Sequence, residues 1–325
     1  MFSRGGRSEA EPRGAPASRP LREGLEGVAP RGALLRVGAA LADGALQGRH
    51  AKRSRGTSTE FYDYQAMLPG EPVAGIDWRL LGRSDRLYRR RFAHEAQASL
   101  MIVLDAGGSM RFAAVDAGRG APTKLRRAEE LAAGLALIAA RAGDRVGLVT
   151  AGSAASASVI EPAAGWRAVH RVVDMLERLE AGAGRAGLAA GVDAAATALP
   201  RGGVMAVVTD GLDDQGPLLA SLRAARGGRS TRGRAAVREV IVLQVLAADE
   251  LRPPVLPDVR LVDPASGARA AGARDGSEAA AYGVLIAERC AQLRRGVLAL
   301  GGRYALHVTD GHAAEALRAV LERGR

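Results

Sequence analysis

Short apolar runs alternate with longer amphipathic stretches along most of the chain. The runs Ser99–Asp105 and Val204–Asp210 are almost continuously apolar and each ends in an acid, as expected of parallel strands buried on both faces. Further strands are predicted at Arg145–Ala151, Ala157–Glu161, Glu239–Leu246 and Tyr304–Val308. Apolar residues recur at helical spacing in Lys124–Arg141, Trp166–Leu179, Leu188–Leu199, Pro217–Ala225, Glu278–Leu300 and Ala313–Glu322. This alternation predicts an α/β fold, an open sheet flanked by helices on both faces.

The N-terminal part of the chain is predicted to differ from this body. Residues 1–30 are rich in Gly, Pro and Arg and carry almost no large apolar side chain, so burial cannot offset the entropy cost of ordering them. We therefore expect a disordered or weakly ordered arm over residues 1–47 and a short β-rich segment over residues 48–98. The α/β domain itself is expected over residues 99–325.

Composition and charge narrow the possible locations and ligands. The 325 residues carry a formal net charge of +11, but with only 3% aromatic residues the chain lacks the stacking platforms of single-strand binders, so nucleic acid is an unlikely partner. A single cysteine, Cys290, rules out an intramolecular disulfide framework and a cysteine-rich zinc site. No segment approaches the ~20 apolar residues of a membrane span, and no apolar stretch follows the first arginines as in a secretory signal. A cytoplasmic location is expected.

Three oxygen-bearing side chains follow two of the predicted strands. Asp105 ends the first strand and is followed by two glycines and Ser109, whereas Asp210 ends the strand that begins at Val204. Ligands of open α/β sheets bind at the carboxyl ends of strands, and Mg²⁺ prefers carboxylate and hydroxyl oxygens. A metal site at Asp105, Ser109 and Asp210 is one interpretation. The other is that Asp105 and Ser109 only cap the turn and the helix that follows it.

The loop from Asp105 to Ser109 resembles the metal-ion-dependent adhesion site of the von Willebrand factor A domain, a Rossmann-type open sheet. That site has an Asp-x-Ser-x-Ser motif, a later Thr and a distal Asp. Asp105, Ser109 and Asp210 match the first Asp, the second Ser and the distal Asp. Gly107 replaces the first Ser, and residues 184–188 offer no hydroxyl where the Thr is expected. The resemblance therefore implies a degenerate site, with Mg²⁺ binding that is weak or absent.

Upstream motifs give a closer resemblance. The blocks Glu60–Tyr64, Leu68–Glu71, Gly75–Arg79 and Leu87–Glu95, together with Leu261–Pro264, are similar to the von Willebrand factor A-like family called domain of unknown function 58. Members of that family commonly accompany MoxR-type AAA+ ATPases. The resemblance implies a protein–protein interaction or adaptor protein that works with such an ATPase. Residues 71–74 depart from the family pattern by losing an acid and an arginine.

The surface that would contact the ATPase is expected at the carboxyl end of the sheet. Met110 beside the metal-site loop is one candidate contact, and the basic run Arg89, Arg90 and Arg91 is the other. The arginines are equally compatible with a solvated strand whose charges pair with nearby acids.

The sequence gives catalysis little support, and we expect a protein that is not an enzyme. Its five histidines are scattered without metal-ligand spacing, and it lacks both a nucleophile elbow and a phosphate-binding Gly-x-x-x-x-Gly-Lys loop. The alternative is a Mg²⁺-dependent hydrolase or phosphotransferase that uses Asp105 and Asp210.

Overall fold

The computed structural model describes residues 33–46, 61–66, 88–92, 97–114, 121–152, 158–184, 187–227, 237–255, 260–263, 267–271 and 275–322. The chain divides into two compact units, one over residues 49–97 and the other over residues 1–48 and 98–325. In the smaller unit, β1 (Phe61–Ala66) pairs with β2 (Tyr88–Phe92) in antiparallel fashion, with an irregular register between Phe61 and Asp63.

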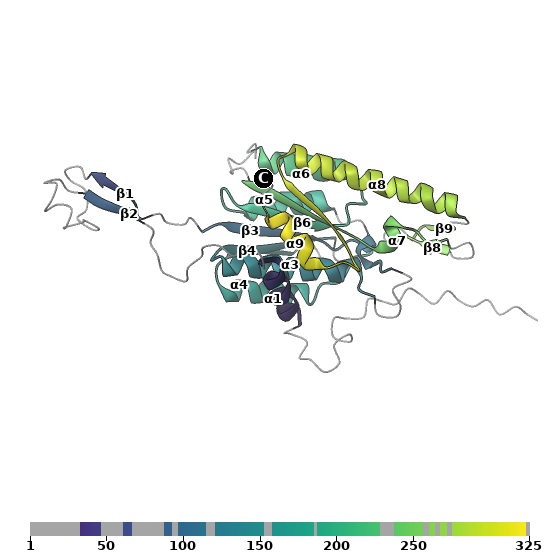
Figure 1. Ribbon diagram of the computed structural model, residues 1–325, viewed down its shortest axis with the longest axis horizontal. Helices are drawn as coiled ribbons and strands as arrows, with labels where there is room; N and C mark the ends of the chain where they lie inside the picture. The colour runs from purple at the N-terminus through teal and green to yellow at the C-terminus, as the bar shows by residue number, and fades with distance from the viewer. Residues whose placement is uncertain are drawn as a thin grey trace, which may run out of the picture. The chain divides into compact units, whose positions relative to one another are not determined.

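The larger unit is built on a six-stranded sheet (Figure 1). Its strands are β3 (Ser99–Asp105), β4 (Arg145–Ala151), β5 (Ser158–Ala163), β6 (Val204–Thr209), β7 (Glu239–Leu246) and β10 (Arg303–Val308). They lie in the order β10-β7-β6-β3-β4-β5, and only the edge strand β5 runs antiparallel to its neighbour. The chain extends the sheet from β3 to β4 on one side and returns to β6 on the other. The strand order therefore reverses between β3 and β6, which is where open α/β sheets bind ligands.

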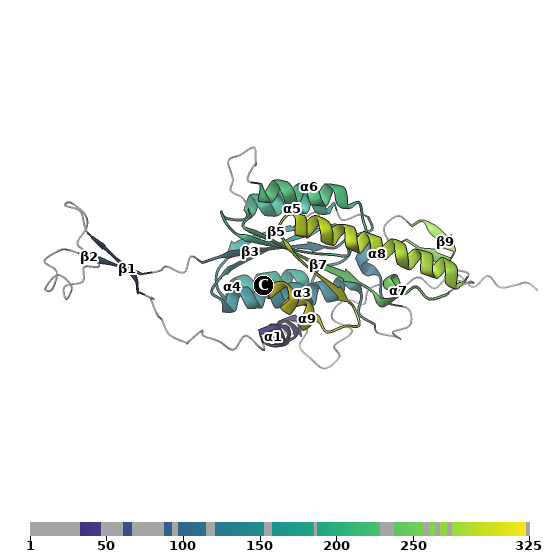
Figure 2. The same cartoon turned by 45° about the horizontal axis from the view of Figure 1, so that its top comes forward.

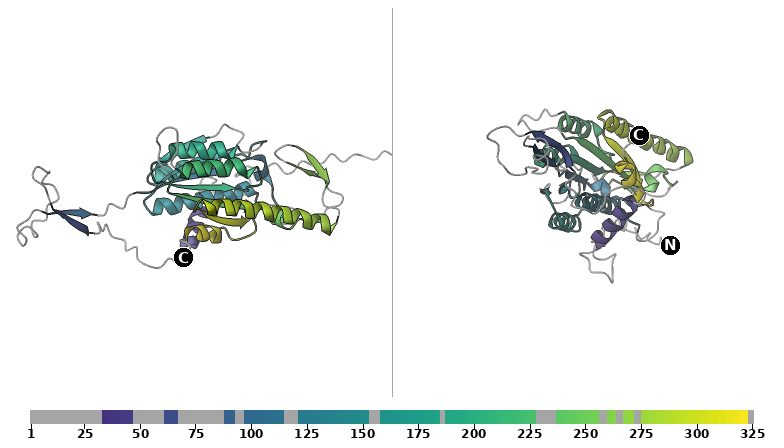
Figure 3. Two further views of the ribbon diagram at one scale, coloured as in Figure 1. Left: turned by 90° about the horizontal axis from the view of Figure 1, so that it is seen from above. Right: turned by 60° about the vertical axis from the view of Figure 1, so that its left-hand side comes forward.

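Helices cover both faces of this sheet (Figures 2 and 3). On one face lie α3 (Lys124–Arg141), α4 (Trp166–Leu176) and α9 (Ala313–Leu321); on the other lie α5 (Leu188–Ala198), α6 (Gln215–Arg226) and α8 (Gly276–Ala299). Shorter elements complete the unit: the 3₁₀ turn η2 (Gly108–Arg111), α7 (Ala248–Leu251), and the antiparallel pair β8 (Arg260–Val262) and β9 (Arg269–Ala271).

Strand residues alternate between the two cores, because successive side chains of a strand point to opposite faces. In β3, Ile102 and Leu104 pack with α3, whereas Met101 and Val103 pack with α5, α6 and α8. The same alternation in β6 sends even-numbered positions such as Val208 to the α3 face. All these side chains are inaccessible to solvent, which explains why both strands read as continuous apolar runs.

Helix α1 (Ala33–Leu46) packs against α3 and α9 on the outside of the unit. The approach is close, because a Cβ on Gly38 would lie 2.7 Å from Leu137 Cδ1 and 3.1 Å from the backbone carbon of Ala133. Ala42 in the same helix is fully buried. The second half of the predicted weakly ordered arm is therefore a helix of the larger unit, and this expectation is corrected.

The predicted α/β class, an open sheet with helices on both faces, is confirmed. The strands at 99–105, 145–151 and 239–246 and the helix at 124–141 have the predicted bounds, and the other predicted elements differ at their ends by a few residues. The smaller unit, residues 49–97, differs by one residue at each end from the predicted segment at 48–98. Residues 1–32 and the motif at 76–79 lie outside the described residues.

Candidate functional site

Asp105 ends β3 and is almost fully buried, with 4% of its surface exposed. Both of its carboxylate oxygens accept hydrogen bonds. The backbone N–H of Gly107 donates to Oδ1 at 2.9 Å, and the hydroxyl of Thr209 donates to Oδ2 at 2.6 Å. Thr209 is the last residue of β6, directly beside Asp105 in the parallel register. The two strands that flank the reversal of strand order are thus joined by side chains at their carboxyl ends.

The environment of Asp105 favours its protonated form. Burial raises the pKa of this carboxyl to about 7, and the nearby charges of Asp210 and Asp213 raise it as well, while the hydrogen bonds from Thr209 and Gly107 act in the opposite direction. A carboxyl group with a pKa near neutrality in a cleft is a feature of functional sites, although structural clusters produce it too.

Asp210 points to the opposite face of the sheet from Asp105. Thr209 lies beside Asp105 in register, so the next residue along the chain faces α3. Oδ1 of Asp210 accepts from the N–H of Leu212 at 3.1 Å, and the hydroxyl of Ser109 also hydrogen-bonds to this carboxylate. The structure therefore brings Asp105, Ser109 and Asp210 to one edge of the sheet, but the two carboxylates have different hydrogen-bond partners.

A buried lysine neutralises Asp210. The ammonium of Lys124, the first residue of α3, lies 2.8 Å from Oδ2 of Asp210 and 2.6 Å from Oε1 of Glu250 in α7. Burial alone would raise the pKa of Asp210, but the charge and hydrogen bond of Lys124, with those from Ser109 and Leu212, hold it below its ordinary value. For Glu250 the effect of burial exceeds that of the same ammonium, and the pKa of its carboxyl is raised.

The loop after β6 is fixed by close contacts. Gly211 has a φ of +62°, and a Cβ at this position would lie 2.6 Å from Cδ2 of Leu293 in α8. The side-chain amide of Gln244 donates to the carbonyl of Asp210 at 2.6 Å, and that of Gln215 donates to the carbonyl of Gly211 at 2.7 Å. The loop that carries Asp210 and Asp213 is therefore held by two buried amides.

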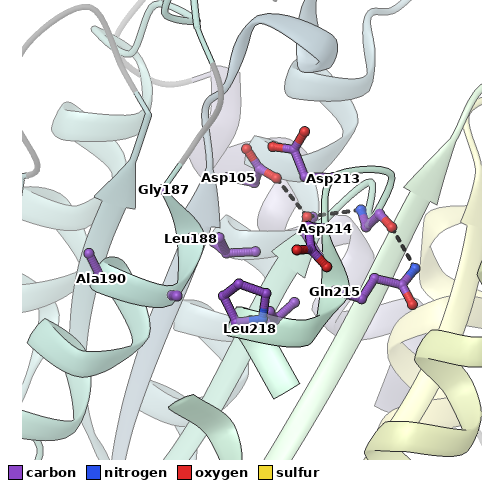
Figure 4. A pocket seen from close by; sticks show the side chains of 12 residues that line it. Asp105, Gly187, Leu188, Ala190, Asp213, Asp214, Gln215 and Leu218 are labelled. Carbon is purple, nitrogen blue, oxygen red and sulfur yellow. Dashed lines mark hydrogen bonds between the residues drawn. The ribbon is translucent and has the colours of Figure 1, made fainter. Parts of the chain in front are cut away.

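A pocket of about 330 Å³ opens at this edge, between the first turns of α5 and α6 (Figure 4). Its acidic groups are Asp105, which is buried, Asp213, which is half-buried, and Asp214, which is exposed and caps α6 by accepting from the N–H of Gly216. The remaining lining is backbone, aliphatic and uncharged polar: Gly187, Leu188, Ala189, Ala190, Thr209, Gly211, Gln215, Pro217 and Leu218. The pocket thus combines negative charge with an apolar wall.

A family model described as "Protein of unknown function DUF58" matches residues 63–279, about two-thirds of the chain. The chain belongs to the DUF58 family. Uncharacterized protein Rv1480 of Mycobacterium tuberculosis and Uncharacterized protein Mb1516 of Mycobacterium bovis are each 27% identical to this DUF58 chain over 229 residues. The match covers 69% of this chain and 67% of each relative.

The solved structures that this chain matches have a low sequence identity to it. The conserved hypothetical protein BatB from Bacteroides thetaiotaomicron is 16% identical, with a TM-score of 0.42 over 69% of this chain and 97% of that one. The SpRpn10 VWA domain is 11% identical, with a TM-score of 0.38 over 68% of this chain and 94% of that one. Among the residues described for this DUF58 protein, no helix is long and apolar enough to cross a bilayer.

The arrangement of the predicted metal ligands does not fit a divalent cation. The oxygens of Asp105 are turned to Thr209 and Gly107, and those of Asp210 to Lys124 and Leu212. Nowhere in the described part of the chain do three or more His, Cys, Asp and Glu side chains form a group that could hold a metal ion. The carbonyl of Gly184 accepts from the N–H of Gly108, so the backbone of the turn before α5 contacts the Asp105 loop.

The predicted partner-binding residues belong to different units of the chain. Met110 is fully buried in the core beneath α3, so the structure removes this side chain from any contact surface. Met110 belongs to η2, the 3₁₀ turn that follows the Asp105 loop, and it packs in the core on the α3 face. The arginines 89–91 lie on β2, in the smaller unit.

Sequence reasoning missed Lys124, Glu250 and Asp213. One signal for the lysine was present: only two of the 46 basic residues are lysine, at positions 52 and 124, in a chain that otherwise uses arginine. Glu250 follows β7 by only a few residues, and carboxyl ends of neighbouring parallel strands meet at one edge. Asp213 was overlooked because it lies three residues beyond the acid that resembled the family motif.

Proposed function

We propose that this DUF58 protein is a non-catalytic adaptor that binds a MoxR-type AAA+ ATPase through the carboxyl edge of its sheet. The observation that carries the proposal is the pocket between α5 and α6. It lies at the reversal of strand order, and it offers carboxylates and an apolar wall to a partner. A partner loop that brings a positively charged side chain would complement Asp213 and Asp214.

The chemistry of the described residues supports binding more than turnover. The hydroxyl of Thr209 is engaged with Asp105, the hydroxyl of Ser109 with Asp210, and the ammonium of Lys124 with two carboxylates. Among the described residues that line the pocket there is no His, Cys, Lys or Ser. The cytoplasmic location expected from the sequence stays a prediction.

The alternative function, a Mg²⁺-dependent hydrolase or phosphotransferase, has one observation in its favour, the raised pKa of Asp105 beside the pocket. It would also need Asp210 as a metal ligand, and this carboxylate holds Lys124. Mg²⁺-dependent turnover of a phosphoester that is lost in Asp105→Asn would favour the enzyme. Binding of the ATPase without turnover favours the adaptor.

Binding to a purified MoxR-type ATPase encoded in the same gene neighbourhood tests the proposal. The variant Ala190→Arg places a long cationic side chain at the exposed rim of the pocket, and Ala224→Arg makes the same change at an exposed site farther along α6. We expect Ala190→Arg to weaken binding about tenfold or more and Ala224→Arg to leave it unchanged. Equal affinities of the two variants would place the contact elsewhere.

We propose that the arginine run on β2 assists by electrostatic steering. Replacing Arg89, Arg90 and Arg91 with Ala should slow association at low salt and leave dissociation nearly unchanged, because long-range charge attraction acts mainly on the rate of encounter. Association rates that do not depend on the substitution at any ionic strength would remove these residues from the proposal.

A further inference from the structure

Lys124 lies fully buried where three separate elements meet. It begins α3, while its two partners come from the end of β6 and from the short helix after β7. The ammonium contacts Asp210 at 2.8 Å and Glu250 at 2.6 Å, and it lies 5.9 Å from the centre of the Phe112 ring. A cation–π contact at this distance adds a modest attraction.

The two carboxylates are otherwise satisfied. Oδ1 of Asp210 accepts from the backbone of Leu212, and Oε2 of Glu250 accepts from the N–H of Ala247 at 2.8 Å. Their remaining oxygens are those that face the ammonium. Burying charges costs free energy unless each is paired and hydrogen-bonded, and this cluster meets both conditions.

A compact point charge suits this position better than a guanidinium. An ammonium can direct its three N–H groups to acceptors from different elements, whereas the planar fork of arginine matches the two oxygens of one carboxylate. The chain uses arginine for 44 of its 46 basic residues, yet it places a lysine here. The choice of residue therefore follows the geometry of the cluster.

We infer that Lys124 is a built-in cation that takes the place of a divalent metal ion at this edge of the sheet and excludes it. Mg²⁺ bound to Asp210 at about 2.1 Å would need its carboxylate oxygens, and one of them already holds the ammonium. Two cations a few ångströms apart in a buried site would also repel each other strongly. The inference goes beyond the proposed function, because it concerns the charge at the edge whichever partner binds there.

Removing the lysine should therefore create a metal-dependent protein. In Lys124→Met, Asp210 and Glu250 remain as buried, uncompensated carboxylates, and Mg²⁺ or Mn²⁺ can replace the lost charge. The matched control is Arg141→Met at the other end of α3, which removes a positive charge from an exposed pair with Asp43.

The experiment measures the melting temperature of the full chain with Mg²⁺ and with chelator, together with Mn²⁺ binding by electron paramagnetic resonance. Wild type and Arg141→Met should show no metal-dependent shift and no stoichiometric Mn²⁺. Lys124→Met should melt lower in chelator, gain about 5 °C or more at saturating Mg²⁺, and bind one Mn²⁺. Adding Asp210→Asn to Lys124→Met should abolish that binding.

Two results would overturn the inference. One is a wild-type protein that binds one Mn²⁺ and loses it in Asp210→Asn. The other is a folded Lys124→Met that shows no response to either metal. If Lys124→Met does not fold in chelator, folding restored by metal supports the inference. If metal does not restore folding, the double variant Lys124→Met/Glu250→Gln is measured in the same way, because it has one buried carboxylate fewer. A double variant that shows no response to Mg²⁺ or Mn²⁺ contradicts the inference.

Discussion

Glu129 in α3 is buried with 2% of its surface exposed and carries an unusual protonation equilibrium. Burial raises the pKa of its carboxyl from 4.5 to about 8, and an ion pair with Arg126 at 3.5 Å only partly opposes this. The folded protein therefore holds a proton that the unfolded chain releases between these two values. Stability should fall as the pH rises through this window.

The variant Glu129→Gln tests this linkage, because Gln keeps the shape and cannot ionise. We expect it to be more stable than wild type at pH 8, by several kcal/mol, and to lose most of that advantage near pH 5. Thermal unfolding followed by circular dichroism from pH 5 to pH 9 measures the difference. A constant offset between the two proteins over that range would show that the carboxyl does not titrate as described.

Gly211 combines a left-handed backbone with a close neighbour, and the chain offers a matched control. Gly143 has a φ of +82° but nothing within 4 Å of an added Cβ, whereas a Cβ on Gly211 would meet Leu293 at 2.6 Å. Gly143→Ala should cost about 1 kcal/mol from backbone strain alone. Gly211→Ala should cost about 2–4 kcal/mol, since the clash with α8 adds to the strain.

Urea unfolding of both variants separates the two contributions. The difference between their midpoints reports the packing of the β6 loop against α8. If both variants lose the same stability, the loop that carries Asp210 can move away from Leu293 at no cost, and the fixed geometry of the site is wrong.

At the scale of elements, α1 is the helix whose contribution to stability can be tested most directly. It covers α3 and α9, with Gly38 against Leu137 and with Gly134 close to both Leu41 and Leu317. Deleting residues 1–46 should expose this apolar surface and destabilise the domain by several kcal/mol. Deleting residues 1–30 leaves α1 whole and should change the melting temperature by no more than a few degrees.

Differential scanning calorimetry of the two truncated chains provides the comparison. Equal melting temperatures for both truncations and the full chain would mean that α1 does not stabilise the domain.

Most helices and strands of the sheet could be predicted because their patterns are strong. β3 and β6 are apolar throughout, and α4 has apolar residues on one side only, with Val169, Val172, Val173 and Leu176 buried. α1 escaped because it follows a long Gly-, Pro- and Arg-rich stretch and no predicted strand lies next to it in the sequence. The pair of β8 and β9 escaped because three-residue strands carry too few positions for a pattern.

The sequence predicted where the candidate site lies, but not which of its side chains contact one another. Strand ends located Asp105, Ser109 and Asp210 at one edge, and this edge is also where the pocket opens. The alternation of side chains that separates Asp105 from Asp210 depends on the register between β3 and β6, which is a long-range property. The pairing of Lys124 with Glu250 likewise joins residues 126 positions apart.

For the molecule as a whole, the proposed adaptor function predicts that the partner binds at one edge of the sheet. The pocket between α5 and α6, the reversal of strand order and the buried cation all lie at the carboxyl end of the sheet. The account therefore predicts a localised footprint rather than a contact spread over several faces.

Hydrogen–deuterium exchange of the full chain, with and without the purified MoxR-type ATPase, tests this claim most directly. Protection is expected in two segments, residues 187–190 at the start of α5 and residues 213–218 at the start of α6. It should be lost in Ala190→Arg and retained in Ala224→Arg. Protection confined to another surface, such as α4, or no protection at saturating ATPase, would contradict the account.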